Sequence, residues 1–105
     1  MDRRTLEQTK QGLHLINVAR GGLIDQNALR DALDTGRVRL ASLDVTDPEP
    51  LPSGHWLYTH PSVRLTPHIS WSGGRSKERL TALIGTNYHR YLAGEPLLNQ
   101  QHKRR

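Results

Sequence analysis

Three short segments rich in apolar residues, at positions 13–18, 40–45 and 63–66, constrain the fold more than any other feature of the sequence. Apolar runs of this length are typical of strands buried in a parallel sheet. The spacing of apolar residues at 26–35, between the first two segments, predicts a helix, and so does the spacing after Gly74. Strand, helix, strand, loop, strand and helix is the alternation of an α/β domain, so we predict three short parallel strands with flanking helices.

Residues that favour turns mark the ends of both predicted helices. Asp25 is a typical N-cap for the helix at 26–35, and Gly36 fits its C-cap position. The second helix should end at Gly94, and its apolar and aromatic residues share one face: Leu80, Leu83, Ile84, Tyr88 and Tyr91. These offsets are typical of one face of an amphipathic helix.

One side chain suited to catalysis follows each predicted strand. Arg20 follows the first strand, Glu49 the second and His68 the third. In open α/β sheets the reactive groups gather beyond the carboxyl ends of the strands. We therefore predict that these three side chains meet at one edge of the sheet.

Arg20 is a candidate for binding an anion, because two glycines follow it and leave its guanidinium unobstructed. The planar guanidinium matches a carboxylate in two parallel hydrogen bonds and can also polarise an adjacent ketone. Taken alone, a surface arginine that closes a turn explains Arg20 equally well.

Glu49 and His68 form a candidate proton-transfer pair. Glu49 lies between two prolines, which stiffen its loop, and a carboxylate that reached His68 would orient the imidazole and favour its charged form. An imidazole, with an ordinary pKa of about 6.5, suits reversible proton transfer to a carbinol oxygen. Without the other residues, an exposed loop glutamate is the better explanation of Glu49. The remaining histidines show no spacing typical of a metal site.

The net charge of +5 raises nucleic acid as a possible partner. The basic residues are spread along the chain, however, and no aromatic residues alternate with them as in a single-strand binding surface. We therefore expect no nucleic-acid partner, and we expect a basic, disordered tail at 100–105. The sequence has no cysteine and no stretch of 18 apolar residues, so we also expect a cytoplasmic protein without a membrane partner.

Three blocks of sequence resemble the D-isomer-specific 2-hydroxyacid dehydrogenases. They are LINVARGGLID at 15–25, SLDV at 42–45 with the Pro-Glu-Pro that follows, and LTPHI at 65–69. The blocks stand in the order of the family and span most of 13–92. The resemblance implies that 1–99 are the C-terminal part of an NAD(P)-binding domain, the second half of a doubly wound, Rossmann-like sheet.

The resemblance also implies an oxidoreductase that transfers hydride between NAD(P)H and a 2-oxo or 2-hydroxy acid. Arg20 would bind and polarise the 2-oxo acid, His68 would exchange the proton, and Glu49 would support His68. Asp44 would hydrogen-bond the nicotinamide carboxamide. The nicotinamide pocket would be lined by Val18, Ala19, Arg20, His68, Ile69, Ser70 and Trp71. Trp71 stands where a small residue is commoner in the family. Full-length members are expected to be homodimers.

The sequence lacks the glycine-rich turn that holds a dinucleotide pyrophosphate, and the acidic residue that follows it at a distance of about 20 positions. We therefore expect a fragment that keeps only the nicotinamide end of an NAD or NADP site and shows no turnover by itself. The alternative is a non-enzymatic remnant that associates with a partner chain through the open edge of its first strand.

Overall fold

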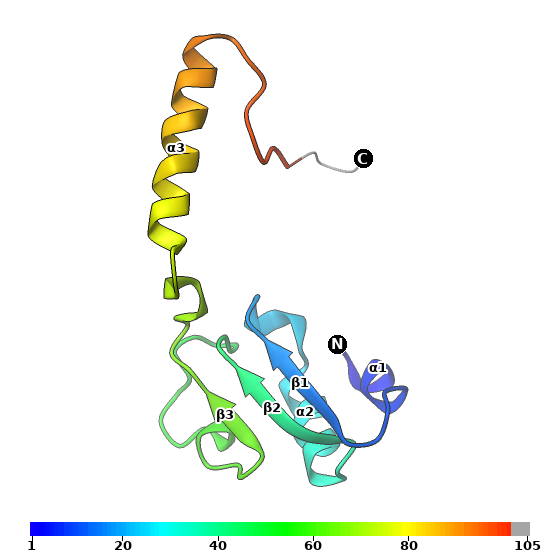
Figure 1. Ribbon diagram of the computed structural model, residues 1–105. Coiled ribbons are helices and arrows are strands. Elements are labelled where there is room, and N and C mark those ends of the chain that lie inside the picture. The colour runs from blue at the N-terminus through cyan, green and yellow to red at the C-terminus, as the bar shows by residue number, and fades with distance from the viewer. Residues whose placement is uncertain (102–105) are drawn as a thin grey trace. The chain divides into compact units, whose positions relative to one another are not determined.

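The computed structural model describes residues 1–101 and divides the chain into two compact units, Met1–Ser70 and one that begins at Trp71. The first unit holds α1 (Arg3–Glu7), β1 (Leu13–Asn17), α2 (Gln26–Asp34), β2 (Val38–Leu43) and β3 (Val63–Leu65), and the second holds α3 (Ser76–Leu92) (Figure 1). Three short 3₁₀ helices complete the set: η1 (Gly21–Leu23), η2 (Trp56–Tyr58) and η3 (Ser70–Ser72).

The strands form one parallel sheet in the order β1-β2-β3. This confirms the predicted α/β class with three parallel strands. Leu15 lies opposite Ala41, and Leu43 lies opposite Leu65, so the carboxyl ends of all three strands share one edge. Strand β2 begins at Val38 rather than at the predicted residue 40, because Val38 is fully buried although arginines flank it.

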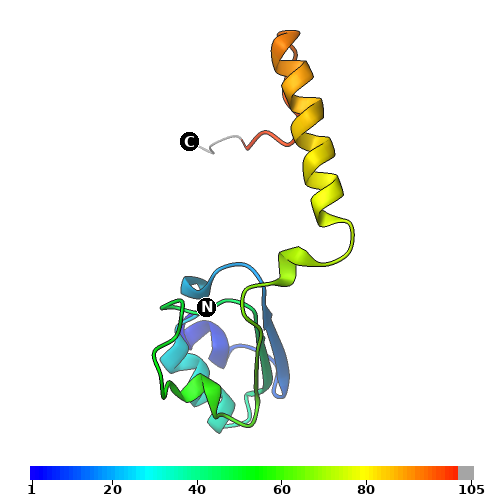
Figure 2. The same cartoon turned by 90° about the vertical axis from the view of Figure 1, so that its left-hand side faces the viewer.

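The core of the first unit lies between the sheet and the helices. Both α1 and α2 lie on the same side of the sheet (Figure 2). The apolar face predicted for α2 is buried, and it packs with residues from every strand and from η2; the largest fully buried side chains are Leu6, Leu29, Leu57, Val38 and Val45. Strand β1 is an edge strand of this sheet, and its residue Ile16 is exposed. Association of a partner chain at that edge stays a prediction.

The caps of α2 agree with the sequence at one end and differ by one residue at the other. The carboxylate of Asp25 accepts hydrogen bonds from the N–H groups of Asn27 and Ala28, at 2.9 and 3.0 Å, as predicted for an N-cap. The C-cap is Thr35 rather than Gly36. Gly36 is the next residue, with a φ of +72° that favours glycine, so it makes the left-handed turn that follows the helix.

Helix α1 is not predicted by the sequence pattern. It is five residues long and buries a single side chain, Leu6, so no apolar periodicity marks it. Asp2 caps it by accepting from the backbone N–H and the hydroxyl of Thr5, at 2.8 and 2.6 Å, and Arg3 pairs with Asp31 of α2 at 2.5 Å. These polar contacts dock the helix without a longer apolar face.

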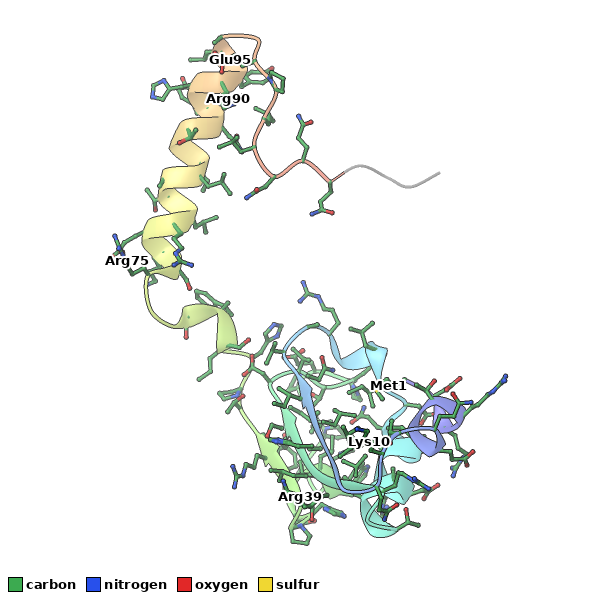
Figure 3. All side chains as sticks on the ribbon, turned by 45° about the vertical axis from the view of Figure 1, so that its right-hand side comes forward. Met1, Lys10, Arg39, Arg75, Arg90 and Glu95 are labelled. Atoms are coloured by element: carbon green, nitrogen blue, oxygen red, sulfur yellow. The ribbon has the colours of Figure 1, made fainter. Side chains whose placement is uncertain are left out.

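Helix α3 is confirmed, and its apolar face is largely exposed. None of its side chains is buried; Leu83 is half-buried, and Leu80, Ile84, Tyr88 and Tyr91 are exposed. The segment after Gly94 turns back along the helix, where Arg90 pairs with Glu95 at 3.1 Å (Figure 3). The periodicity therefore marks a face for which the second unit itself supplies no cover within the residues described.

No helix within 1–101 has the length and apolar character needed to cross a membrane. Of the tail predicted at 100–105, positions 100 and 101 are exposed and belong to no helix or strand, and 102–105 lie outside the described residues.

Candidate active site

The three candidate catalytic residues lie in the loops that follow three different strands. Arg20 follows β1, Glu49 follows β2 and His68 follows β3. Because the strands are parallel, these loops leave the same edge of the sheet.

The structure brings Glu49 and His68 together. The Nδ1 atom of His68 lies 2.7 Å from Oε1 of Glu49, and their side chains are 41% and 40% exposed. An ionised carboxylate can only accept hydrogen bonds, so Nδ1 carries the proton in this pair and the other ring nitrogen, Nε2, is the atom suited to acid–base exchange. The pair is fixed at one end and still open to a small molecule.

The loop that carries Glu49 is anchored on both sides of that residue. Thr46 donates from its hydroxyl to the carbonyl of Pro48 at 3.0 Å. Beyond Glu49, Leu51 is buried in the core, and its carbonyl accepts a hydrogen bond from the Tyr58 hydroxyl at 3.2 Å. These contacts hold a loop that belongs to no helix or strand.

His68 lies in a tight turn whose following residues are hydrogen-bonded to Asp44. Its φ of +54° is in the left-handed region, which is unusual for a residue with a side chain. The Asp44 carboxylate, 4% exposed, accepts from the N–H groups of Ile69 and Ser70, at 3.0 and 2.8 Å, and from the Thr66 hydroxyl. The turn is therefore fixed by bonds to a buried side chain that directly follows the neighbouring strand, β2.

The same contacts set the charge of Asp44. The Thr66 hydroxyl, and after it the N–H and hydroxyl of Ser70 and the N–H of Ile69, hold the pKa of the Asp44 carboxyl well below its usual range, although burial acts in the opposite direction. Asp44 is therefore ionised throughout the neutral pH range. Thr66 has no role assigned from the sequence; it follows β3 beside the end of β2, and that register is the signal that could have found it.

Arg20 lies in the loop after β1, and its guanidinium donates to the carbonyl of Ala19 at 2.7 Å. Asn17, which is 7% exposed, holds this loop: its side-chain amide donates to the Arg20 carbonyl at 2.9 Å and accepts from the Ala19 N–H at 3.1 Å. A Cβ atom on Gly21 would lie 2.0 Å from the carbonyl of Thr46. The loop of Arg20 therefore packs directly against the start of the loop of Glu49.

The residues expected to line the nicotinamide pocket fall into these same loops. Val18, Ala19, Ile69 and Ser70 are exposed there. Trp71 is also exposed, at 61%, and is the first residue of the second unit. The sequence reasoning missed Asn17, which bonds to its own loop, and also Thr66 and the close contact of Gly21, which depend on residues that follow another strand.

A cavity of about 460 Å³ lies beside Glu49. Its size is within the range of small-molecule sites, and its walls are partly apolar. Of the residues expected around the nicotinamide, however, only Asp44 lines it; the walls are formed by Asp44, Thr46, Glu49, Pro50, Leu51, Tyr58, Leu65, Thr66 and Pro67. The fit to a carboxamide is poorer, because the oxygens of Asp44 already accept hydrogen bonds from their own chain.

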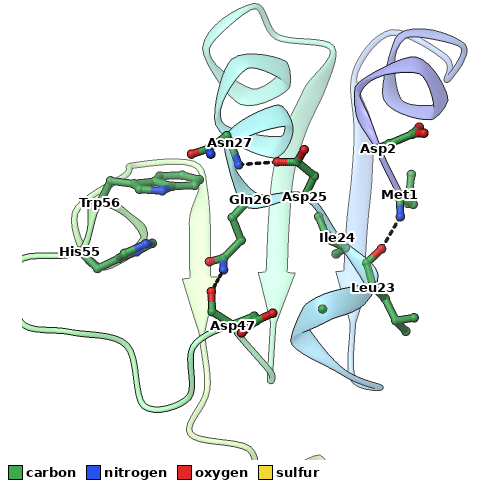
Figure 4. A pocket seen from close by; sticks show the side chains of 11 residues that line it. Met1, Asp2, Leu23, Ile24, Asp25, Gln26, Asn27, Asp47, His55 and Trp56 are labelled. Atoms are coloured by element: carbon green, nitrogen blue, oxygen red, sulfur yellow. Dashed lines mark hydrogen bonds between the residues drawn. The ribbon is translucent and has the colours of Figure 1, made fainter.

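A larger hollow, of about 610 Å³, lies at the N-terminal end of α2 and holds none of the three candidate catalytic residues. Gln26 crosses it to donate to the carbonyl of Asp47, and Trp56 lies on its far side (Figure 4). Of the three candidate catalytic residues, Glu49 lines the smaller cavity, whereas Arg20 and His68 line neither of the two. Among residues 1–101, no three His, Asp or Glu side chains group closely enough to hold a metal ion.

Comparison with known proteins gives a family match over 1–70, to the family described as "D-isomer specific 2-hydroxyacid dehydrogenase, NAD binding domain". The chain is 37% identical over 99 residues to the D-3-phosphoglycerate dehydrogenase of Bacillus subtilis, covering 94% of this chain and 19% of that protein. It is 36% identical over 91 residues to the human glyoxylate reductase/hydroxypyruvate reductase, covering 87% and 28%. The chain thus spans less than a third of the length of these two curated relatives.

Solved structures agree with these matches. A D-isomer specific 2-hydroxyacid dehydrogenase from Xanthobacter autotrophicus, crystallised with NADPH and MES, aligns with a TM-score of 0.86 and 38% identity over 97% of this chain and 41% of that one. The apo D-mandelate dehydrogenase of Rhodotorula graminis aligns with a TM-score of 0.83 and 36% identity, over 98% and 30%.

Proposed function

Since the chain belongs to the D-isomer specific 2-hydroxyacid dehydrogenases, an NAD(P)-binding oxidoreductase family, we propose that it supplies the catalytic groups for interconverting a 2-oxo acid and a D-2-hydroxy acid. The observation that carries the proposal is the hydrogen bond between Glu49 and His68, at the sheet edge where the Arg20 loop also lies. A cation, an imidazole and a carboxylate are the groups that this reaction needs.

Arg20 binds the substrate in this proposal. Its planar guanidinium pairs with the substrate carboxylate in two parallel hydrogen bonds and polarises the neighbouring ketone. Support comes from the exposed position of Arg20 and from the loop that Asn17 and Gly21 fix behind it. The substrate is therefore held by its 2-oxo acid end, which all members of this substrate class share.

His68 moves the proton. In the reducing direction Nε2 donates a proton to the oxygen that becomes the hydroxyl, and in the oxidising direction it accepts that proton. Glu49 accepts the hydrogen bond from Nδ1–H and fixes the ring orientation.

The cofactor, when bound, supplies or accepts the hydride at the substrate carbon. Val18, Ala19, Ile69 and Ser70 are the side chains of the first unit that would hold its nicotinamide end, and a contact from Trp71 stays a prediction. A hydrogen bond from the carboxamide to Asp44 stays a prediction. So do the choice between NAD and NADP, the location of the protein in the cytoplasm and the homodimeric state of full-length members.

A chimaera tests the proposal. Residues 13–98 replace the matching segment of the human glyoxylate reductase/hydroxypyruvate reductase, and consumption of reduced nicotinamide cofactor is followed with glyoxylate and with hydroxypyruvate. We expect turnover, and we expect His68→Gln to lower kcat by about 10²- to 10⁴-fold, the usual contribution of a general acid–base residue.

The control for this experiment is His89→Gln, which changes an exposed histidine of α3 and should leave kcat unchanged. If the His68→Gln chimaera turned over as fast as its parent, the assignment of proton transfer to His68 would be wrong.

A further inference from the structure

We propose that Asn17 and Asp44 are positioning residues that fix the loops of Arg20 and His68 before substrate binds. This inference rests on the proposed function, which makes those two loops catalytic. It deepens that function, because it assigns the preorganisation of the site to two side chains beneath it.

Asn17 and Asp44 are the two buried polar residues of the described chain. A buried polar group destabilises the fold unless it is hydrogen-bonded. Both side chains form their hydrogen bonds with the loops that follow the strands, and neither one bonds to a residue of the apolar core. Their burial is therefore explained by what they hold.

Asn17 holds the Arg20 loop through both ends of its amide. Nδ2 donates to the carbonyl of Arg20 and Oδ1 accepts from the N–H of Ala19, at 2.9 and 3.1 Å. Asn17 is the last residue of β1, and these two bonds hold the turn that follows it. The backbone at Arg20, from which the guanidinium extends, is thereby fixed.

Asp44 holds the His68 turn in a similar way. A carboxylate offers about four acceptor positions, and the donors from Thr66, Ile69 and Ser70 lie on both of its oxygens. His68 lies between Thr66 and Ile69 and adopts the left-handed φ of +54°, which a residue with a side chain keeps only when its surroundings enforce it. Asp44 therefore acts on the reaction through His68.

Asn17 and Asp44 are themselves connected by a backbone hydrogen bond. The backbone N–H of Asp44 donates to the carbonyl of Asn17 at 2.9 Å, which continues the β1–β2 pairing beyond the end of β2. The two side chains that bond to the loops of Arg20 and His68 thus belong to residues that are themselves hydrogen-bonded, at the ends of β1 and β2. Their relative placement is set before either loop begins.

Hydrogen exchange of the 105-residue chain, followed by NMR, tests the proposal without any substitution. The Ile69 and Ser70 amides lie outside the strands, but bonds to a buried carboxylate should slow their exchange by about 10- to 100-fold relative to the exposed loop amides of Ser53 and Gly54. Exchange as fast as that of Ser53 and Gly54 would overturn the role of Asp44.

Two substitutions then separate positioning from general stability. Asp44→Asn preserves shape and removes the charge, so we expect faster exchange at Ser70 and a shift of the low-field Hδ1 signal that His68 shares with Glu49. Asn17→Leu should alter the Ala19 and Arg20 amides and leave the His68 ring signals in place. The matched control is Asp47→Asn, the same change at an exposed carboxylate of the Glu49 loop.

The proposal is wrong if Asp44→Asn leaves the Ser70 exchange and the His68 signals as in Asp47→Asn. If a variant fails to fold, the exchange rates of the Ile69 and Ser70 amides in the unsubstituted chain decide whether Asp44 holds the turn. None of these readouts needs turnover, so an inactive chimaera would count against the proposed function and would leave the positioning of the two loops as measured.

Discussion

Gly21 is the residue at which the loop of Arg20 touches the loop of Glu49. A Cβ atom there would lie 2.0 Å from the carbonyl carbon and oxygen of Thr46, which are backbone atoms that cannot rotate away. At Gly22 the nearest atom is a side-chain oxygen of Asp47, at 3.4 Å. Two adjacent glycines therefore meet very different surroundings.

We expect Gly21→Ala to lower the free energy of unfolding by about 1–3 kcal/mol, because the new methyl group forces two loops apart. Urea denaturation of the purified chain measures this change. The matched control, Gly22→Ala, should fall within about 0.5 kcal/mol of the unsubstituted chain. Equal effects of the two substitutions would show that the loops are not in contact.

From the lowered pKa of Asp44 we predict how the free energy of unfolding depends on pH. Its pKa in the folded chain is lower than in the unfolded chain, so its stabilising effect is complete above the ordinary carboxyl pKa of about 4 and is lost as the pH falls below that value. We expect the free energy of unfolding to decrease as the pH is lowered from 5 toward 2, measured by urea titration at each pH.

The variant Asp44→Asn should flatten this decrease, and Asp47→Asn should keep it. A decrease of the same size in Asp44→Asn would assign the acid sensitivity to other carboxylates, such as Asp2, whose pKa the Thr5 hydroxyl and N–H also lower.

At this scale the sequence indicates the candidate catalytic residues more readily than the residues proposed to position them. Arg20, Glu49 and His68 can be found because their chemistry and their places after apolar segments are visible in one dimension. Asn17 and Thr66 are harder to find: Asn17 bonds to the backbone of the loop that directly follows it, and Thr66 donates to the Asp44 carboxylate, which only the register of β2 and β3 brings near.

At the scale of elements, helix α2 is the best determined part of the chain. Its N-cap, its apolar face and its burial all agree with its sequence, so local signals and tertiary packing favour the same structure. Helix α3 carries a weaker apolar pattern and buries none of it among the described residues. Periodicity thus predicts that a helix forms but does not predict that its apolar face is buried.

The N-cap of α2 can be tested directly. Asp25→Ala removes the acceptor for two N–H groups and should lower the free energy of unfolding by about 1 kcal/mol, measured by urea denaturation. Asp25→Ser keeps an acceptor oxygen and should recover most of that loss. A serine variant as unstable as the alanine variant would show that the charge, rather than the cap, stabilises the helix.

At the scale of the whole molecule, stability should be uneven, because the core lies in the first unit. We expect the amides of β2 and α2 to exchange with solvent far more slowly than those of α3, in a hydrogen-exchange experiment on the intact chain. Helix α3 has good local hydrogen bonds but no buried side chain. Protection of α3 equal to that of β2 would mean that its exposed face is covered in solution.

The central claim is that Arg20 and His68 belong to one substrate site, and an NMR titration of the chain with glyoxylate tests it most directly. We predict that the Arg20 Nε–H signal and the His68 ring signals shift together with a single dissociation constant, that Arg20→Gln abolishes both shifts, and that the His89 ring signals stay unchanged. A shift of Arg20 with no response at His68, or different dissociation constants at the two residues, would contradict the claim.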